Sequence, residues 1–143
     1  SGGQCLDIDS EGKRLSVDQL RSLHAAKTGA LIRTSFQIGA LCAGEHEGSR
    51  NFQVLTKVGS DIGLAFQIVD DILDVTSDSE TLGKPSQSDE VAEKNTFPRL
   101  MGVKKSQEEA NELLASSLQL LCDCGIENPA LASLLRQTVS RQN

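Results

Sequence analysis

Three carboxylates stand within an apolar run near the middle of the chain, residues 66–74, whose sequence is FQIVDDILD. A helix turns about 100° per residue, which places one set of polar and small residues on a single face: Gly59, Gly63, Gln67, Asp70 and Asp74. A second set, spaced by three or four residues, is apolar: Leu55, Val58, Ile62, Ala65, Val69 and Ile72. The pattern therefore predicts a helix from Asn51 to about Thr76 that packs its apolar face into a core and lines a cavity with its polar face.

The chemistry that best suits convergent carboxylates is a hard divalent cation, because Mg²⁺ prefers oxygen ligands and often shares a phosphate-bearing substrate. Asp70 and Asp74 share one face of the predicted helix, and Asp71 points about 100° away. Asp70 is therefore predicted to be the principal Mg²⁺ ligand, with Asp74 binding the metal through water. An acidic triplet can also be a solvated helix face, but the apolar residues around it would then be exposed to water, and we favour a site.

The rest of the chain is also predicted to be helical. Ser16 and Gln19 form a capping-box pattern for a short helix through His24, and Ser106 with Glu109 repeats it for a later one that stops before Gly125. A helix rich in small residues is expected over 25–43, where Gly29 and Gly39 indicate close approach to another helix or to a ligand. Asn128 precedes Pro129 at the start of the last helix. No segment alternates with a period of two, so we predict an all-α protein.

The acidic segment resembles the second aspartate-rich motif of the trans-isoprenyl diphosphate synthases, and its context is most similar to the bacterial members that make farnesyl diphosphate. Other matches follow the family's order: Lys27-Thr28-Gly29-Ala30-Leu31 upstream, and Gly83-Lys84, Asp89, Lys94 and Thr96-Phe97-Pro98 downstream. The resemblance covers the chain from Gly3-Gln4 onward, but only the C-terminal half of a family member, and the first aspartate-rich motif is absent. It implies an antiparallel helix bundle of the isoprenoid synthase type, with residues 1–143 as the C-terminal part of one domain.

The resemblance also implies a function, the condensation of isopentenyl diphosphate with an allylic diphosphate, from geranyl to farnesyl diphosphate, by a Mg²⁺-dependent prenyltransferase that forms a homodimer. Its implied metal ligands are Asp70, Asp71 and Asp74, and its implied diphosphate ligands are Lys27, Lys84 and Lys94. Gln67 and Thr28 are implied to form hydrogen bonds near the reacting centre. Since one of the two acidic motifs is missing, we expect this chain alone to be inactive. The family usually has a glycine where Gln87 stands, which puts the flexibility of that loop in question.

Two other classes of function stay open. A terpene cyclase of the same helical superfamily would use a related metal site, and a helical interaction module would keep the residues without catalysis. Taken alone, Lys27 could be an ordinary exposed lysine. The segment 77–98, which we expect to be a long polar loop, could be a solvated connector instead of a binding loop.

Composition excludes further classes. The net charge of −6 and the absence of Trp and Tyr argue against nucleic-acid binding. No apolar run approaches the roughly 20 residues that span a bilayer, and there is no signal-peptide pattern, so we expect a cytoplasmic protein with reduced cysteines.

Two motifs are rejected. Residues 7–18 resemble an EF-hand loop, but Asp18 stands where a Glu is expected, and too few residues precede Asp7 to form the entering helix. Gly83-Lys84 lacks the earlier glycine and the Ser or Thr of a P-loop.

Overall fold

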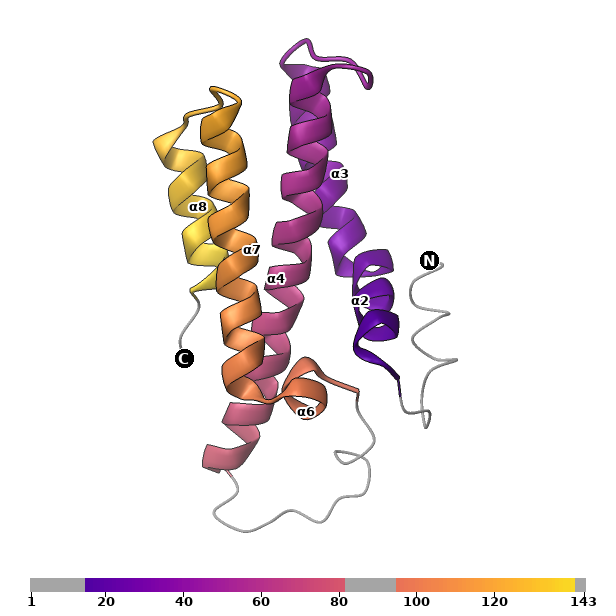
Figure 1. Cartoon of the computed structure of the whole chain (residues 1–143), viewed down its shortest axis with the longest axis vertical. Coiled ribbons are helices and arrows are strands. Elements are labelled where there is room, and N and C mark those ends of the chain that lie inside the picture. The colour runs from indigo at the N-terminus through magenta and orange to yellow at the C-terminus, as the bar shows by residue number, and fades with distance from the viewer. Residues whose placement is uncertain (1–14, 82–94, 141–143) are drawn as a thin grey trace.

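The computed structural model describes residues 15–81 and 95–140, without the side chains of 78–81, and these residues form helices and no strand. In chain order the helices are α2 (Val17–Ala26), α3 (Thr28–Cys42), α4 (Arg50–Thr81), α6 (Phe97–Met101), α7 (Val103–Asp123) and α8 (Pro129–Val139). Figure 1 shows them as a bundle around α4, with α3 on one side and α7 and α8 on the other. The predicted all-α class is confirmed.

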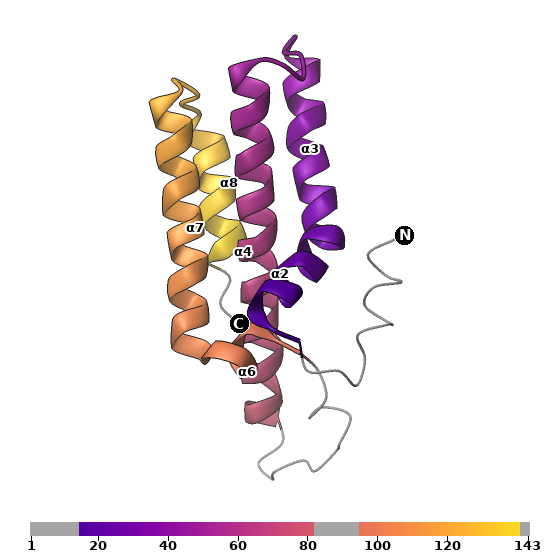
Figure 2. The same ribbon diagram turned by 45° about the vertical axis from the view of Figure 1, so that its right-hand side comes forward.

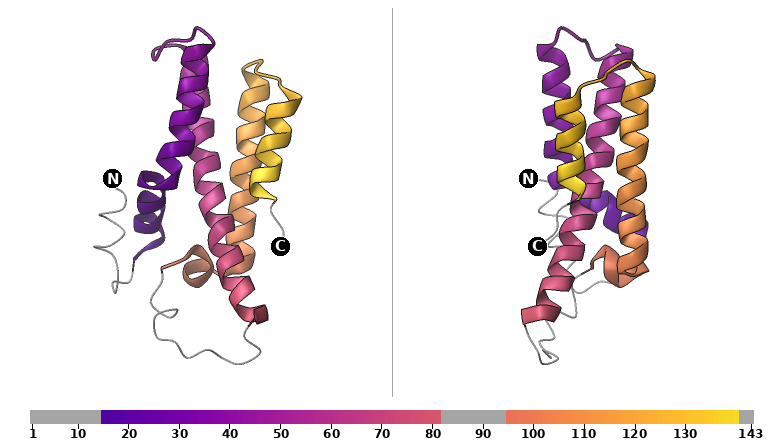
Figure 3. Two further views of the ribbon diagram at one scale, coloured as in Figure 1. Left: turned by 180° about the vertical axis from the view of Figure 1, so that it is seen from behind. Right: turned by 90° about the vertical axis from the view of Figure 1, so that its left-hand side faces the viewer.

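The long helix α4 forms the centre of the core. The predicted apolar face is buried as expected: Val58, Ile62, Ala65, Val69 and Ile72 are each at most 8% exposed, and Leu55 packs against them partly buried. The helix is longer than the predicted 51–76 and continues to Thr81. Its last turns extend past the neighbouring helices, as Figure 3 shows.

Local sequence signals explain most helix ends. The Ser16 hydroxyl accepts a hydrogen bond from Gln19 N at 3.2 Å, and the Gln19 side chain accepts one from Ser16 N at 2.8 Å, which is the predicted capping box. Asn128 caps α8 by accepting from Ala130 N at 2.9 Å. Gly125, at φ +70°, follows the end of α7 as expected.

The predicted start of α7 is wrong. The helix begins at Val103, and Ser106 lies inside it, fully buried, with its hydroxyl donating to Gly102 O at 2.9 Å. Glu109 pairs with Arg21 instead of capping, with 2.6 Å between Nη2 and Oε1. The physical reason is Gly102, whose φ of +91° lets the chain turn sharply from α6 into α7.

The predicted helix over 25–43 is interrupted at Lys27. Its backbone has φ −94° and ψ −107°, and its N–H bonds to the carbonyls of Leu23 and His24, both at 3.2 Å. The break turns α2 away from α3, so that α2, α4 and α6 contact one another (Figure 2).

The predicted loop over 77–98 is shorter at both ends, because α4 continues to Thr81 and α6 begins at Phe97. Residues 82–94 lie outside the described part of the chain, and so do Lys84, Gln87 and Lys94. Residues 7–14 of the rejected EF-hand segment also lie outside the described part of the chain. None of the helices within the described ranges is long and apolar enough to cross a membrane.

Candidate functional site

The first half of the polar face of α4 is a helix contact and does not line a cavity. A side-chain Cβ added at Gly63 would lie 2.8 Å from the Cα of Gly29, and one at Gly59 would lie 2.9 Å from the Cα of Arg33. Both distances fall well below an ordinary carbon contact, so α3 and α4 touch backbone to backbone here. A Cβ added at Gly39 would meet nothing within 4 Å among the described residues, so the expected close approach to another helix is wrong there.

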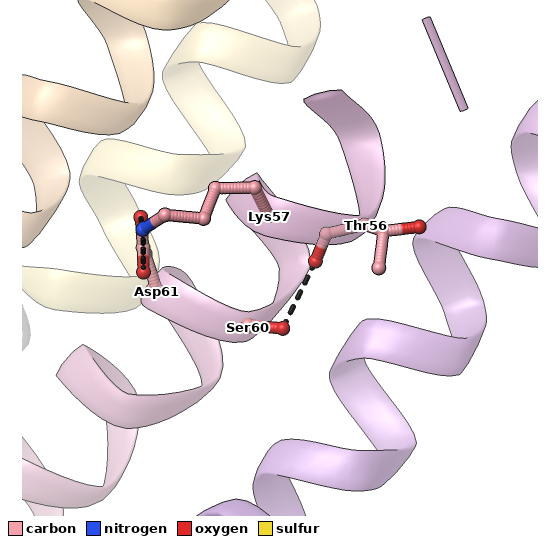
Figure 4. A network of polar contacts seen from close by, with 4 residues as sticks. All are labelled: Thr56, Lys57, Ser60 and Asp61. Atoms are coloured by element: carbon pink, nitrogen blue, oxygen red, sulfur yellow. Dashed lines mark hydrogen bonds and ion pairs between the residues drawn. The ribbon is translucent and has the colours of Figure 1, made fainter. Parts of the chain in front are cut away.

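Two polar contacts on the earlier turns of α4 join residues of that same helix. Figure 4 shows Lys57 Nζ in an ion pair with Asp61, at 2.6 Å from Oδ1 and 2.5 Å from Oδ2. It also shows the Ser60 hydroxyl donating to Thr56 O at 3.0 Å. Asp61 is thus a paired carboxylate within α4, separate from the acidic triplet further along the helix.

The second half of the same face reaches solvent. Asp70 and Asp74, one helical turn apart, are both exposed, whereas Gln67 is 7% exposed. Within the described ranges the Asp70 carboxylate makes no hydrogen bond or ion pair. An exposed carboxylate pair on one helix face is compatible with Mg²⁺, which is usually bound through one or two carboxylates, water and substrate phosphates.

Asp71 faces a different part of the bundle. Its Oδ2 accepts a hydrogen bond from the backbone N–H of Phe97 at 3.0 Å and lies 3.4 Å from Nε2 of His24. The His24 ring stacks on the Phe97 ring, with centroids 5.6 Å apart. This carboxylate therefore joins α4 to α2 and α6, and its predicted role as a metal ligand stays a prediction.

The lysine–threonine pair lies at the break between α2 and α3. Lys27 is exposed and Thr28 is half-buried. Gly29, directly after them, touches Gly63, which is seven residues before Asp70. Since α3 runs antiparallel to α4, the break brings Lys27 and Thr28 to the end of α4 that carries the carboxylates.

The described residues alone do not form a complete metal cage. No group of three or more His, Cys, Asp or Glu side chains that could hold a metal ion occurs among them. If the two exposed carboxylates bind a metal, further ligands would have to come from substrate, from water or from protein outside the described residues.

A separate cleft of about 580 Å³ lies between α2, α6 and α7. It is lined by Arg21, Met101, Lys105, Glu108, Glu109, Glu112, Leu113 and Ser116. The cleft is open and contains charges of both signs, bridged by the Arg21–Glu109 ion pair. None of the three carboxylates of the acidic segment contributes to it.

Sequence reasoning missed His24 and the backbone amide of Phe97. His24 figured there only as the end of a short helix, because its contact with Asp71 joins residues far apart in the sequence. The only available signal was its position three residues before Lys27, which places it beside a candidate site residue without indicating a partner.

The fold and the site together define a class of protein, an all-helical bundle whose central helix presents a carboxylate pair suited to a divalent cation and a phosphate-bearing ligand. Comparison with known proteins makes this specific. The family model described as Polyprenyl synthetase matches residues 1–122. Since this is most of the sequence, the chain belongs to the polyprenyl synthetase family.

Individual relatives agree with this assignment. Farnesyl diphosphate synthase of Escherichia coli is 43% identical over 143 residues, covering 98% of this chain and 48% of the relative. Geranylgeranyl pyrophosphate synthase 10 of Arabidopsis thaliana is 40% identical, covering 99% and 42%. The crystal structure of an FPP/GFPP synthase from Zymomonas mobilis has a TM-score of 0.76 at 29% identity, covering 96% of this chain and 44% of that one. The chain thus spans about half the length of the relatives that it matches.

Proposed function

We propose that this chain is the diphosphate-binding part of an isoprenyl diphosphate synthase that condenses isopentenyl diphosphate with an allylic diphosphate, from geranyl to farnesyl diphosphate. The observation that carries the proposal is the exposed pair Asp70 and Asp74, placed just beyond the Gly29–Gly63 contact and at the same end of α4 as Lys27. Family membership supports the reaction class. A relative named farnesyl diphosphate synthase is 43% identical to this chain, and one named geranylgeranyl pyrophosphate synthase is 40% identical. The relatives therefore do not fix the product length.

The residues have separate tasks in this proposal. Asp70 would hold Mg²⁺ directly and Asp74 would hold it through water, while Asp71, which contacts His24 and Phe97, stays a predicted ligand at the side of the site. Bound Mg²⁺ would supply positive charge to a departing pyrophosphate. Lys27, Lys84 and Lys94 bind the diphosphate as point charges.

Two polar residues and the assembly complete the proposal. Thr28 and Gln67 form hydrogen bonds near the reacting centre. The position of Gln67, about one turn before Asp70 on the same face of α4 and 7% exposed, supports a place beside the carboxylates. The proposed assembly is the homodimer that the resemblance implies.

Calorimetry with Mg²⁺ and inorganic pyrophosphate tests the binding half of the proposal. Asp70→Asn should weaken binding by at least about tenfold, because a charged metal ligand becomes a neutral one. The matched control is Asp123→Asn, which makes the same charge change at the end of α7, where the side chain accepts from Gln119 Nε2 at 2.7 Å and an amide oxygen can still accept. Equal affinity of wild type and Asp70→Asn contradicts the assignment, and absence of any binding favours a helical interaction module.

The catalytic half is tested by supplying radiolabelled isopentenyl diphosphate with geranyl diphosphate and Mg²⁺. We expect this chain alone to give no sustained turnover, because loss of a single charge-stabilising group costs about 10²–10³ in rate and a whole acidic motif is missing from the sequence. Addition of a separately expressed N-terminal half of a relative should restore product. Turnover by the purified, monomeric chain contradicts the expectation.

A further inference from the structure

His24 is a buried imidazole whose polar atoms are poorly satisfied. Its side chain is 11% exposed, and neither ring nitrogen makes a well-aligned hydrogen bond within the described residues. Leaving a buried polar group in this state is destabilising. Stacking on Phe97 explains why a flat ring stands at this position. It does not explain the two ring nitrogens, because a leucine of similar size would fill the space without burying polar atoms.

The acceptor within reach of His24 is the carboxylate of Asp71. Nε2 lies 3.4 Å from Oδ2, and this same oxygen accepts the hydrogen bond from Phe97 N at 3.0 Å. The first distance slightly exceeds the usual 2.7–3.2 Å of an N–H···O bond, so Nε2 lies just beyond hydrogen-bond distance of this oxygen. One carboxylate oxygen of α4 therefore receives a side chain from α2 and a backbone amide from α6.

This three-helix junction lies directly beside the proposed ligands. Asp71 is next to Asp70 in α4, and His24 is three residues before Lys27, at the end of α2. The contacts of Asp71 with α2 and α6 limit rotation of α4 about its own axis. A rotation of about 100°, the angle between successive residues of a helix, would turn Asp70 away from the exposed face of α4.

We propose that His24 is a positioning residue: together with the Phe97 amide it holds the Asp71 carboxylate, and so it sets the orientation in which α4 presents Asp70. The role concerns geometry and involves no proton transfer. The binding measurement that tests this role rests on the proposed function, because it uses Mg²⁺ and pyrophosphate as ligands.

Two variants separate positioning from packing. His24→Leu keeps the bulk against Phe97 but removes the donor, whereas His24→Gln places an amide Nε2 at similar reach. Loss of a group that orients a metal-binding carboxylate typically costs about 10–100-fold in affinity. We therefore expect His24→Leu to weaken Mg²⁺–pyrophosphate binding by about tenfold or more, and His24→Gln to stay within about threefold of wild type. If the residue only fills space, His24→Leu binds as wild type does.

A second measurement needs no ligand. Hydrogen exchange of the Phe97 amide in the intact chain reports on its bond to Asp71. We expect exchange about tenfold faster in His24→Leu and near the wild-type rate in His24→Gln. In the background Asp71→Asn, which keeps an acceptor for Phe97 but removes the charge, the effect of His24→Leu should vanish.

The two measurements distinguish two failures. If wild type binds no Mg²⁺–pyrophosphate, the proposed function fails. The hydrogen exchange of the Phe97 amide in the His24 and Asp71 variants then decides the role of His24 by itself. If Phe97 exchanges equally in His24→Leu and in wild type, or if Asp71→Asn leaves the effect of His24→Leu unchanged, the positioning role is overturned.

Discussion

Replacing Gly63 by alanine tests the backbone contact between α3 and α4. The added methyl carbon would lie 2.8 Å from Gly29 Cα and 3.2 Å from Gly29 O. Carbon atoms pack at about 3.5–4.0 Å, so α3 and α4 would have to separate by roughly 0.7–1.2 Å. The atoms that resist are backbone atoms of another helix, which cannot move aside by changing a rotamer.

The expected cost follows from two opposing effects. Alanine is favoured over glycine inside a helix by about 1 kcal/mol, and overpacking of a tight contact costs about 1–3 kcal/mol. Separating the helices also loosens the packing of Phe36, which lies against Gly59 one turn along the same contact. We therefore expect a net loss near 1–2 kcal/mol in the free energy of unfolding, with a fall of about 3–8 °C in Tm for a chain of this size.

Urea unfolding followed by circular dichroism measures this free energy, and Gly39→Ala is the matched control. Gly39 also lies within a helix, but a Cβ there meets nothing within 4 Å, so the substitution should stabilise the chain by up to about 1 kcal/mol. Gly59→Ala should behave as Gly63→Ala does, because its Cβ would lie 2.9 Å from Arg33 Cα. If Gly63→Ala is as stable as Gly39→Ala, α3 and α4 do not touch here.

Two further outcomes follow from single contacts. Asn128→Ala should lower the free energy of unfolding by about 1 kcal/mol, because the side chain accepts from Ala130 N and Leu131 N at the start of α8; a change within 0.3 kcal/mol in urea unfolding would show that this cap contributes little. The hydrogen bond to Glu127 and its negative charge raise the pKa of the exposed Cys122 thiol, so Glu127→Gln should speed alkylation of Cys122 near pH 8 while Cys42 keeps its rate, and equal Cys122 rates in both proteins would contradict this.

The sequence predicts the helices well where their signals are local. The apolar spacing of α4 is a property of one helix, and a capping box such as that of Ser16 needs only four consecutive residues. The same pattern at Ser106 misled, since nothing in it reveals that Gly102 already turns the chain. A capping pattern therefore identifies a helix more reliably than it identifies the first residue of that helix.

The site could be predicted only in part, because the periodicity of a helix shows which residues share a face and not what covers that face. Asp70 and Asp74 share a face as expected, but in the described structure that face is exposed instead of lining a cavity, and Gly59 and Gly63 of the same face pack on α3. The partners of Asp71 come from α2 and from the start of α6, across sequence separations that no local pattern spans.

The break at Lys27 explains how one face of α4 serves two purposes. Up to Gly63 the face is covered, since α3 lies against it with glycines on both sides of the contact. At Lys27 the chain leaves the path of α3, and α2 instead approaches α4 at Asp71, about 100° around the helix from Asp70. The covering helix therefore departs from this face at the level where the carboxylates begin, and Asp70 and Asp74 stay exposed. Had α3 extended two more turns beyond its N-terminal end in a straight line, it would have covered those carboxylates, and burying a charged group in a helix contact is costly.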